Sequence, residues 1–420
     1  MTIGRTPLWS ATVIVATCGE AEDRAPASAV RDSAGVRIIE SAAPVWGAGE
    51  QWRLSAEPTV EIRGDGDDTD EMPLDPASVF RAGEEIVVAD GISVGLHRLL
   101  VYDAAGRFLR TIGRGGQGPC EFAQLWWAQP YRGDSIAAYD YDDHDISIFA
   151  PDGSCGREVR FPQWHPPIER GTYGYSAGVD GAFDDGSFLA QPYGYLDVSA
   201  GPGPAWYRHA FLRTPPDGVT YDSLGLFEIA QAYWTGTSTG EYPFGAYGNR
   251  IVAGDGFYFG RGDVFEIRRY DPDGTLTDII RRQFEPQLVT ARDRAEYTDL
   301  YVEMIRNASS DHGGDEAALR ARARIEAATF APAKPAFSDL VVDSDGNLWV
   351  QEYRHHLAIE AAGALPPVRW SVFDPEGRWL GDVEMAGRFT PKTIADGEVL
   401  GVWKDETGIA HVQAYRLQRD

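Results

Sequence analysis

A short pattern recurs five times along this 420-residue chain: an apolar run, Asp or Pro, one or two residues, Gly, and a second apolar run. In the clearest copy, residues 97–122, Leu99, Val101 and Phe108 are strong strand formers, and Gly106 can adopt the positive φ of a tight turn. Each copy therefore predicts an antiparallel β-hairpin. The five turn glycines are Gly106, Gly153, Gly218, Gly274 and Gly377.

The spacing of these glycines predicts a repeat architecture. Successive turn glycines are 47, 65, 56 and 103 residues apart, and residues 78–122 hold four strands in about 45 residues, the size of one propeller blade. The one long gap contains a segment of helical periodicity, in which Tyr297, Leu300 and Tyr301 fall on one face. The sequence therefore predicts an all-β fold, a six-bladed β-propeller with a two-helix insertion near residues 290–330.

Five of the six predicted blades are complete within the repeats. The sixth needs an N-terminal strand, either Val36 to Ser41 or its neighbour in residues 52–62. Joining the two ends of the chain in one sheet would hide the last unpaired strand edge.

The N-terminus is typical of an exported protein. Residues 1–18 contain Arg5, an apolar stretch from Leu8 to Ala16, and Cys18, and they resemble a bacterial lipoprotein signal whose cysteine is acylated. An ordinary secretory signal is the alternative, and the apolar stretch is too short to span a bilayer. We expect lipid attachment at Cys18, placing the protein in the periplasm or at the cell surface, with its only membrane contact through the lipid.

The domain organisation follows from the same reading. Residues 19–33 are small, polar and charged, and predict a disordered tether, which leaves residues 34–420 for the propeller and its insertion. The net charge of −26 argues against nucleic acid as a partner. Cys120 lies in a loop between repeats and Cys155 in a turn within a repeat, so we expect them on opposite faces of the blades and unpaired.

One segment resembles a known family. Residues 110–122, RTIGRGGQGPCEF, are similar to the Gly-Pro-Gly-Glu-Phe loop of the six-bladed β-propeller family of bacterial lipoproteins, related to NHL-repeat and TolB-like propellers. The strands at 86–90, 99–113 and 337–350 are also similar to that family, while Cys120 stands where the family has glycine. The resemblance implies the propeller fold and export; the family is largely without assigned chemistry.

Motifs for catalysis or metal binding are weak. Residues 174–178 fit the G-x-S-x-G string, but a loop and a strand follow it instead of a helix. His355 and His356 are neighbours in a predicted strand, so their side chains leave opposite faces. The acidic stretches at 64–71, 271–274 and 343–347 resemble cation loops, but they also fit plain turns, which we favour. We therefore predict no catalytic, cofactor or metal residues, with bound Ca²⁺ as the alternative.

Aromatic residues crowd the connections of two neighbouring blades. They are either wedges between blades or a contact surface for sugars or peptides. These residues are Trp126, Trp127, Tyr131, Trp164, Tyr173, Tyr175, Tyr193, Tyr195, Trp206 and Tyr207.

Two hypotheses of function remain. The first is a monomeric binding or scaffold module for a protein, peptide or carbohydrate partner, with no catalysis. The second is a metal-assisted hydrolase or lactonase-like propeller enzyme with acidic ligands at the central channel. Asp90, Asp140 and Asp343 are the candidate ligands, because each ends a strand in a repeated position. Only fold analogy supports the enzyme.

Overall fold

The structure is a computed structural model that describes residues 27–47, 49–64, 71–91, 96–161, 172–173, 178–192, 194–309, 313–355, 357 and 365–419. Cys18, the acidic residues 65–70, most of the G-x-S-x-G string and His356 lie outside the described residues.

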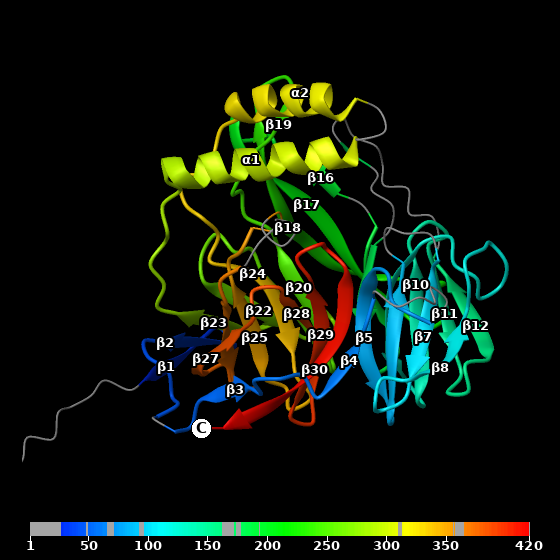
Figure 1. Ribbon diagram of the computed structural model, residues 1–420. Helices are drawn as coiled ribbons and strands as arrows, with labels where there is room; N and C mark the ends of the chain where they lie inside the picture. The colour runs from blue at the N-terminus through cyan, green and yellow to red at the C-terminus, as the bar shows by residue number, and fades with distance from the viewer. Residues whose placement is uncertain are drawn as a thin grey trace, which may run out of the picture.

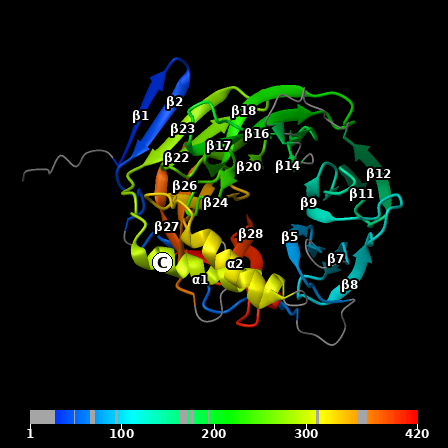
Figure 2. The same ribbon diagram turned by 90° about the horizontal axis from the view of Figure 1, so that it is seen from above.

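Six β-sheets stand around a central axis, as Figure 2 shows, which confirms the six-bladed propeller. In each sheet one edge strand lies innermost, and most of these inner strands contact the next one around the ring. Blade 1 is β5 (Pro76–Ala82), β6 (Glu85–Asp90), β7 (Arg98–Tyr102) and β8 (Phe108–Ile112). Blade 2 is β9 (Leu125–Tyr131), β10 (Ser135–Asp140), β11 (Asp145–Phe149) and β12 (Cys155–Arg160). Blade 3 is β13 (Thr172–Tyr173), β14 (Gly178–Ala182), β15 (Phe188–Gln191), β16 (Gly194–Leu196), β17 (Gly203–Thr214), β18 (Asp222–Trp234) and β19 (Thr239–Gly240).

The second half of the ring carries the strands contributed by the N-terminus. Blade 4 is β20 (Asn249–Ala253), β21 (Gly256–Gly260), β22 (Glu266–Tyr270) and β23 (Leu276–Arg282), extended by β2 (Val36–Ser41) and β1 (Ser28–Ser33). Blade 5 is β24 (Phe337–Val342), β25 (Leu348–Glu352), β26 (Val368–Phe373) and β27 (Trp379–Met385). Blade 6 is β28 (Phe389–Ala395), β29 (Glu398–Lys404) and β30 (Ala410–Arg419), with β3 (Trp52–Leu54) and β4 (Val60–Ile62).

The ring closes through the second of the two expected strands. β4 pairs antiparallel with β30, opposing Ile62 to Val412, and β3 pairs with the end of the same strand. β2 instead pairs in parallel with β23 on the outside of blade 4, and β1 pairs with β2. Residues 28–33, expected in the tether, therefore form a strand, because the free edge of a sheet offers backbone hydrogen bonds that need no apolar side chains.

The five turn glycines fasten blades 1 to 5 each to the blade before it. All five have φ between +73° and +84°, as the predicted hairpins require. Each turn also lies against the outer strand of the preceding blade: a Cβ on Gly153 would lie 2.8 Å from Ile112 Cγ1 in β8, and one on Gly218 would lie 2.7 Å from Val159 Cγ1 in β12. The repeated glycine thus serves both the turn and the contact between blades.

The expectation that Cys120 and Cys155 stay unpaired is wrong, because they form a disulfide with a Cα–Cα distance of 5.9 Å. The connection that leaves blade 1 after Ile112 runs beside the turn of blade 2, as the close approach of Ile112 to Gly153 shows. The backbone N–H of Cys120 also donates to Glu158 Oε1 on β12, at 2.7 Å. The twist of the blades therefore places a loop of one repeat beside a turn of the next.

The insertion consists of α1 (Ala291–Ala308) and α2 (Gly314–Glu326), which lie across one face of the ring in Figure 1. α1 starts with a capping box, in which the side chains of Thr290 and Asp293 each accept a hydrogen bond from the other residue's backbone N–H. A small core of its own, including Tyr301, Val302 and Ile325, packs against Phe244 of the ring. Neither helix in the described part of the chain is both long enough and apolar enough to cross a bilayer.

Candidate ligand-binding site

The structure gives Asp90 and Asp140 the same structural role. Asp90, at the end of β6, accepts from the backbone N–H of Leu74 and Asp75 at 2.7 Å, just before β5. Asp140, at the end of β10, accepts in the same way from Ala123 at 2.6 Å, just before β9. Each carboxylate therefore anchors the connection that enters its own blade.

Asp343 does not join them. Its carboxylate accepts from Asn347 N–H at 2.8 Å and from Trp349 Nε1 at 2.9 Å, within the hairpin turn between β24 and β25. That turn is at the opposite end of its sheet from the positions of Asp90 and Asp140. The three candidate ligands are not brought together, and the described residues hold no group of three His, Cys, Asp or Glu side chains placed for a metal ion.

Two of the aromatic residues singled out in the sequence, Trp127 and Tyr131, pack between strands and blades. Trp127 stacks on Tyr139 and donates its Nε1–H to the Val179 carbonyl of blade 3, and Tyr131 stacks on Phe188 of the same blade. Trp126 is partly exposed. Of the ten aromatic residues, those with described side chains do not line the largest cavity, which confirms the wedge interpretation for Trp127 and Tyr131.

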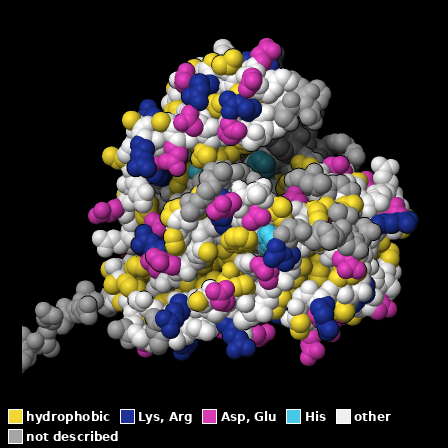
Figure 3. All heavy atoms as spheres, viewed as in Figure 1, with side chains coloured by type: hydrophobic (Ala, Val, Ile, Leu, Met, Phe, Trp, Pro, Cys, Tyr) yellow, Lys and Arg dark blue, Asp and Glu magenta, His cyan; other side chains and the backbone are white. Residues whose placement is uncertain are grey.

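The largest cavity, about 960 Å³, lies between the helical insertion and the face of blades 3 to 5. Its walls come from the end of β18, the connection at 239–248, the start of β20, α1 and the segments around α2, β24 and β25. In Figure 3 the surface is recessed beneath the helices. The insertion therefore converts an open ring face into a recessed, partly open cavity of a volume typical for small-ligand sites.

The cavity has its own aromatic lining. The aromatic residues facing it are Tyr233, Tyr242, Phe244, Tyr247, Phe337, Tyr297 and Tyr353. Phe244 is 8% exposed, contacts the ring of Tyr297 at a centroid distance of 5.5 Å, and holds the unusual φ of +61°. Tyr247 is 59% exposed. Because burial raises the pKa of Tyr242, Tyr297 and Tyr353, all three remain neutral phenols that can donate hydrogen bonds.

Two of the three arginines at the cavity are neutralised by carboxylates. Arg324 of α2 pairs with Glu241 at 3.2 Å, which ties the insertion to the ring. Arg250 of β20 donates two hydrogen bonds to Asp180 of β14, at 2.7 and 2.8 Å. Near this pair, burial lowers the pKa of His209 to about 4, and the positive charge of Arg250 adds to the shift. His209 is therefore neutral at pH 7.

The third arginine, Arg354, differs from the other two. Its Nη1 donates to the Gly387 carbonyl, but its buried Nε and Nη2 have no hydrogen-bond partner among the described residues. Burial lowers the pKa of the Arg354 guanidinium, and no carboxylate in the described part of the chain opposes that shift.

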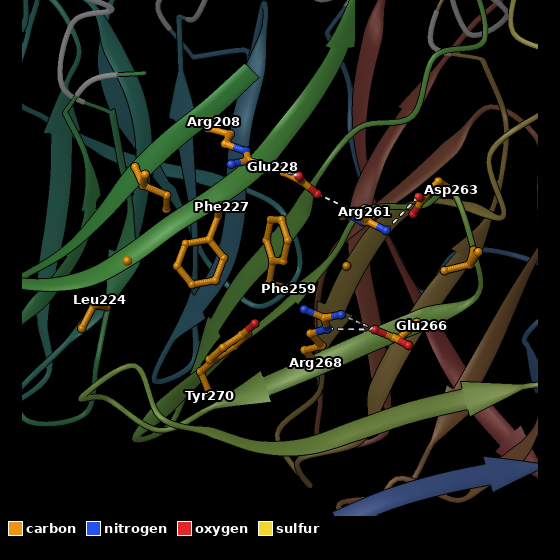
Figure 4. Close-up of a pocket in the computed structure, with 14 residues that line it drawn as sticks. Arg208, Leu224, Phe227, Glu228, Phe259, Arg261, Asp263, Glu266, Arg268 and Tyr270 are labelled. Carbon is orange, nitrogen blue, oxygen red and sulfur yellow. Dashed lines mark hydrogen bonds and ion pairs between the residues drawn. The ribbon is translucent and has the colours of Figure 1, made fainter. Parts of the chain in front are cut away.

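A smaller cavity of about 450 Å³ between blades 3 and 4 is also lined by charged residues, shown in Figure 4. Its charges form pairs: Arg208 and Arg261 both bind Glu228, Arg261 also binds Asp263 at 3.0 Å, and Arg268 binds Glu266 at 2.8 Å. These mutual pairs leave little charge free to attract a ligand, so the cavity beneath the helices is the stronger candidate.

The sequence predicted the insertion but not the site beneath it. The lining residues come from segments as far apart as β18 and β25, and no periodicity links them. One signal was present, since tyrosine and phenylalanine recur in EYPFGAY, residues 241–247, shortly before β20.

No protein-family model matches the chain, and no sequence among curated proteins matches it. Solved structures do resemble it. A member of the DUF4221 family from Bacteroides vulgatus matches 89% of this chain and all of its own, with 10% identity and a TM-score of 0.51. A putative exported protein from Bacteroides fragilis matches 91% of this chain and all of its own, with 13% identity and a TM-score of 0.48. Virginiamycin B lyase from Staphylococcus aureus matches 88% of this chain and all of its own, with 11% identity and a TM-score of 0.39. At these identities the likeness concerns the fold alone, and membership of the six-bladed lipoprotein family stays a prediction.

Proposed function

We propose that this protein is an exported propeller that binds a small amphipathic molecule, such as a short glycan or peptide, in the cavity beneath its helical insertion. The observation that carries the proposal is the cavity of about 960 Å³ lined by tyrosines and phenylalanines from the ring and the insertion. Aromatic rings offer flat contact area, and neutral phenols add hydrogen bonds, a combination that suits sugars and peptides.

The insertion contributes directly to this site. Tyr297 of α1 and Arg324 of α2 line the cavity, and the ion pair of Arg324 with Glu241 fixes α2 to the ring. The metal-assisted hydrolase alternative has no ligand set among the described residues, so we do not propose it.

The binding role can be tested by screening small glycans and short peptides for stabilisation of the protein, followed by calorimetric titration of those that bind. Tyr247→Ala should weaken the best ligand roughly tenfold, because an exposed ring at the cavity is lost. Tyr221→Ala is the matched control, since Tyr221 is 51% exposed but lies outside the cavity. Equal affinity of both variants and the wild type would contradict the proposed site.

We further propose that the protein is anchored to a bacterial membrane through a lipid on Cys18. Support comes from the lipoprotein-like signal in residues 1–18 and from the exported description of the Bacteroides fragilis protein. Metabolic labelling with palmitate should mark the wild type and not Cys18→Ser, which should move to the soluble fraction. Unlabelled wild type that is still exported would indicate an ordinary secretory signal.

A further inference from the structure

Arg354 carries a positive charge that nothing in the described part of the chain balances. It follows β25 and lines the cavity beneath the helices. Of its hydrogen-bond donors, Nη1 binds the Gly387 carbonyl, while Nε and Nη2 are buried and have no partner within residues 313–355, 365–419 and the other described ranges. Removing a charged group from water without a counter-charge is costly, so such an arrangement calls for an explanation.

The other two arginines of the cavity are paired with carboxylates, so the positive charge in excess comes from Arg354. Arg250 is paired with Asp180 and Arg324 with Glu241, so among the cavity residues that the structure describes the charge of Arg354 is left as a net positive charge. The whole protein carries a net charge of −26. A local positive charge in so acidic a protein would favour an anion that enters the cavity, although the average surface repels anions.

The two free donors also have a defined geometry. In a guanidinium group, Nε–H and the N–H of Nη2 point in parallel from the same edge, and this edge forms paired hydrogen bonds with a planar carboxylate. In Arg354 these are the two groups without a partner. An ammonium group would offer a point charge with no such edge.

We propose that the ligand of this cavity bears a carboxylate, which pairs with the Nε–Nη2 edge of Arg354 while the rest of the ligand lies against the tyrosines. This inference rests on the proposed function, because it names the chemistry of a ligand bound in the same cavity. Both nitrogens are covered in the present arrangement, so the side chain of Arg354 turns toward the cavity when the carboxylate binds. The carboxylate then supplies the counter-charge and the hydrogen bonds that Arg354 lacks.

The test compares acids with neutral molecules of the same shape. The probes are galacturonate against galactose and 4-hydroxyphenylacetate against its amide, titrated calorimetrically into the full protein at constant ionic strength. We expect each acid to bind at least tenfold more tightly than its neutral counterpart. Arg354→Met should abolish that preference, and Arg354→Lys should retain only part of it because the paired donors are lost.

A control variant, and the melting temperature of the protein without ligand, separate a role of Arg354 in ligand binding from a role in folding. Arg320→Met removes an arginine of α2 that is paired with Glu316 and does not line the cavity, and it should keep the preference for acids within threefold of the wild type. Arg354→Met without ligand should melt at the same temperature as the wild type or higher, because an unbalanced buried charge is removed.

The possible results distinguish a failure of the carboxylate inference from a failure of the proposed function. If acids and neutral counterparts bind with equal affinity, the carboxylate inference is overturned while the cavity remains the binding site. If no probe binds the wild type, both the inference and the proposed function are overturned. A marked loss of thermal stability in both Arg354 variants would also overturn the inference, since it would show that the residue supports the fold.

Discussion

The contact between neighbouring blades can be tested at Gly153, in the turn between β11 and β12. Its φ of +84° lies in the left-handed region, and an added Cβ would lie 2.8 Å from Cγ1 and 3.0 Å from Cδ1 of Ile112, on the outer strand of blade 1. Gly153→Ala therefore introduces two separate costs, one in the backbone and one in the packing between blades.

The size of each cost follows from the geometry. An alanine held in the left-handed region costs about 1 to 2 kcal/mol. Forcing a methyl group into a filled contact costs about 1 to 3 kcal/mol more. Gly133→Ala is the matched control, because Gly133 also lies in a hairpin turn with φ of +64° but has no atom within 4 Å of the added Cβ. Gly153→Ala should thus lose about 1 to 3 kcal/mol more than Gly133→Ala.

Guanidinium unfolding followed by tryptophan fluorescence measures both losses. Ile112→Ala removes the side-chain atoms that the new methyl group would meet, so combining it with Gly153→Ala should recover about 1 kcal/mol or more as a coupling energy. Equal losses for Gly153→Ala and Gly133→Ala, or no coupling with Ile112→Ala, would refute the claim that the turn glycines fasten the blades together.

Three further predictions concern the disulfide, a buried carboxylate and a structural turn. Replacing Cys120 and Cys155, which are 35 residues apart, by serine should lower the free energy of unfolding by about 4 kcal/mol. A reductant should lower the free energy of unfolding of the wild type by the same amount. An unchanged unfolding midpoint in either experiment would contradict the disulfide. Burial, with nearby acidic groups, raises the pKa of Asp145 from 3.8 to about 6, so its stabilising contribution is lost as pH rises through 6. Asp145→Asn should therefore be more stable than the wild type at pH 7.5, by up to about 3 kcal/mol. The two proteins should be equally stable below the unfolded pKa of 3.8. A difference in stability that does not change with pH would argue against the raised pKa. Asp343→Ala should lower the free energy of unfolding by about 2 to 4 kcal/mol, because it leaves Trp349 Nε1 and two backbone N–H groups without an acceptor. A chelator should not move the unfolding midpoint of the wild type. A chelator effect equal to that of the substitution would show a cation at this turn.

Local chemistry explains which parts of the fold could be predicted. The hairpins depend on strand formers on either side of a glycine with positive φ, and the first turn of α1 depends on Thr290 and Asp293, three residues apart. These interactions are made within a few residues of each other. For the same reason the turn role of Asp343 could be recognised as an alternative to a cation loop, although the opposite placement of its turn relative to Asp90 could not.

The errors arose where the outcome depends on twist and on contacts between distant segments. Cys120 and Cys155 pair because the twist of the blades rotates a turn of blade 2 beside the connection leaving blade 1. Residues 28–33 form β1 because the edge of blade 4 was free to accept β2, which a local pattern of polar residues does not reveal.

The sequence by itself determined the repeating hairpin, the number of blades and the position of the helical insertion, because each depends on residues close together in the chain. Only the tertiary structure decided which N-terminal strand closes the ring and where a ligand would bind. The cavity is built from segments of blades 3 to 5 and two helices. The unbalanced charge of Arg354 exists only after folding has removed it from water with no carboxylate of the described residues beside it. Such a charge balance is a property of the assembled site and has no counterpart in the order of residues along the chain.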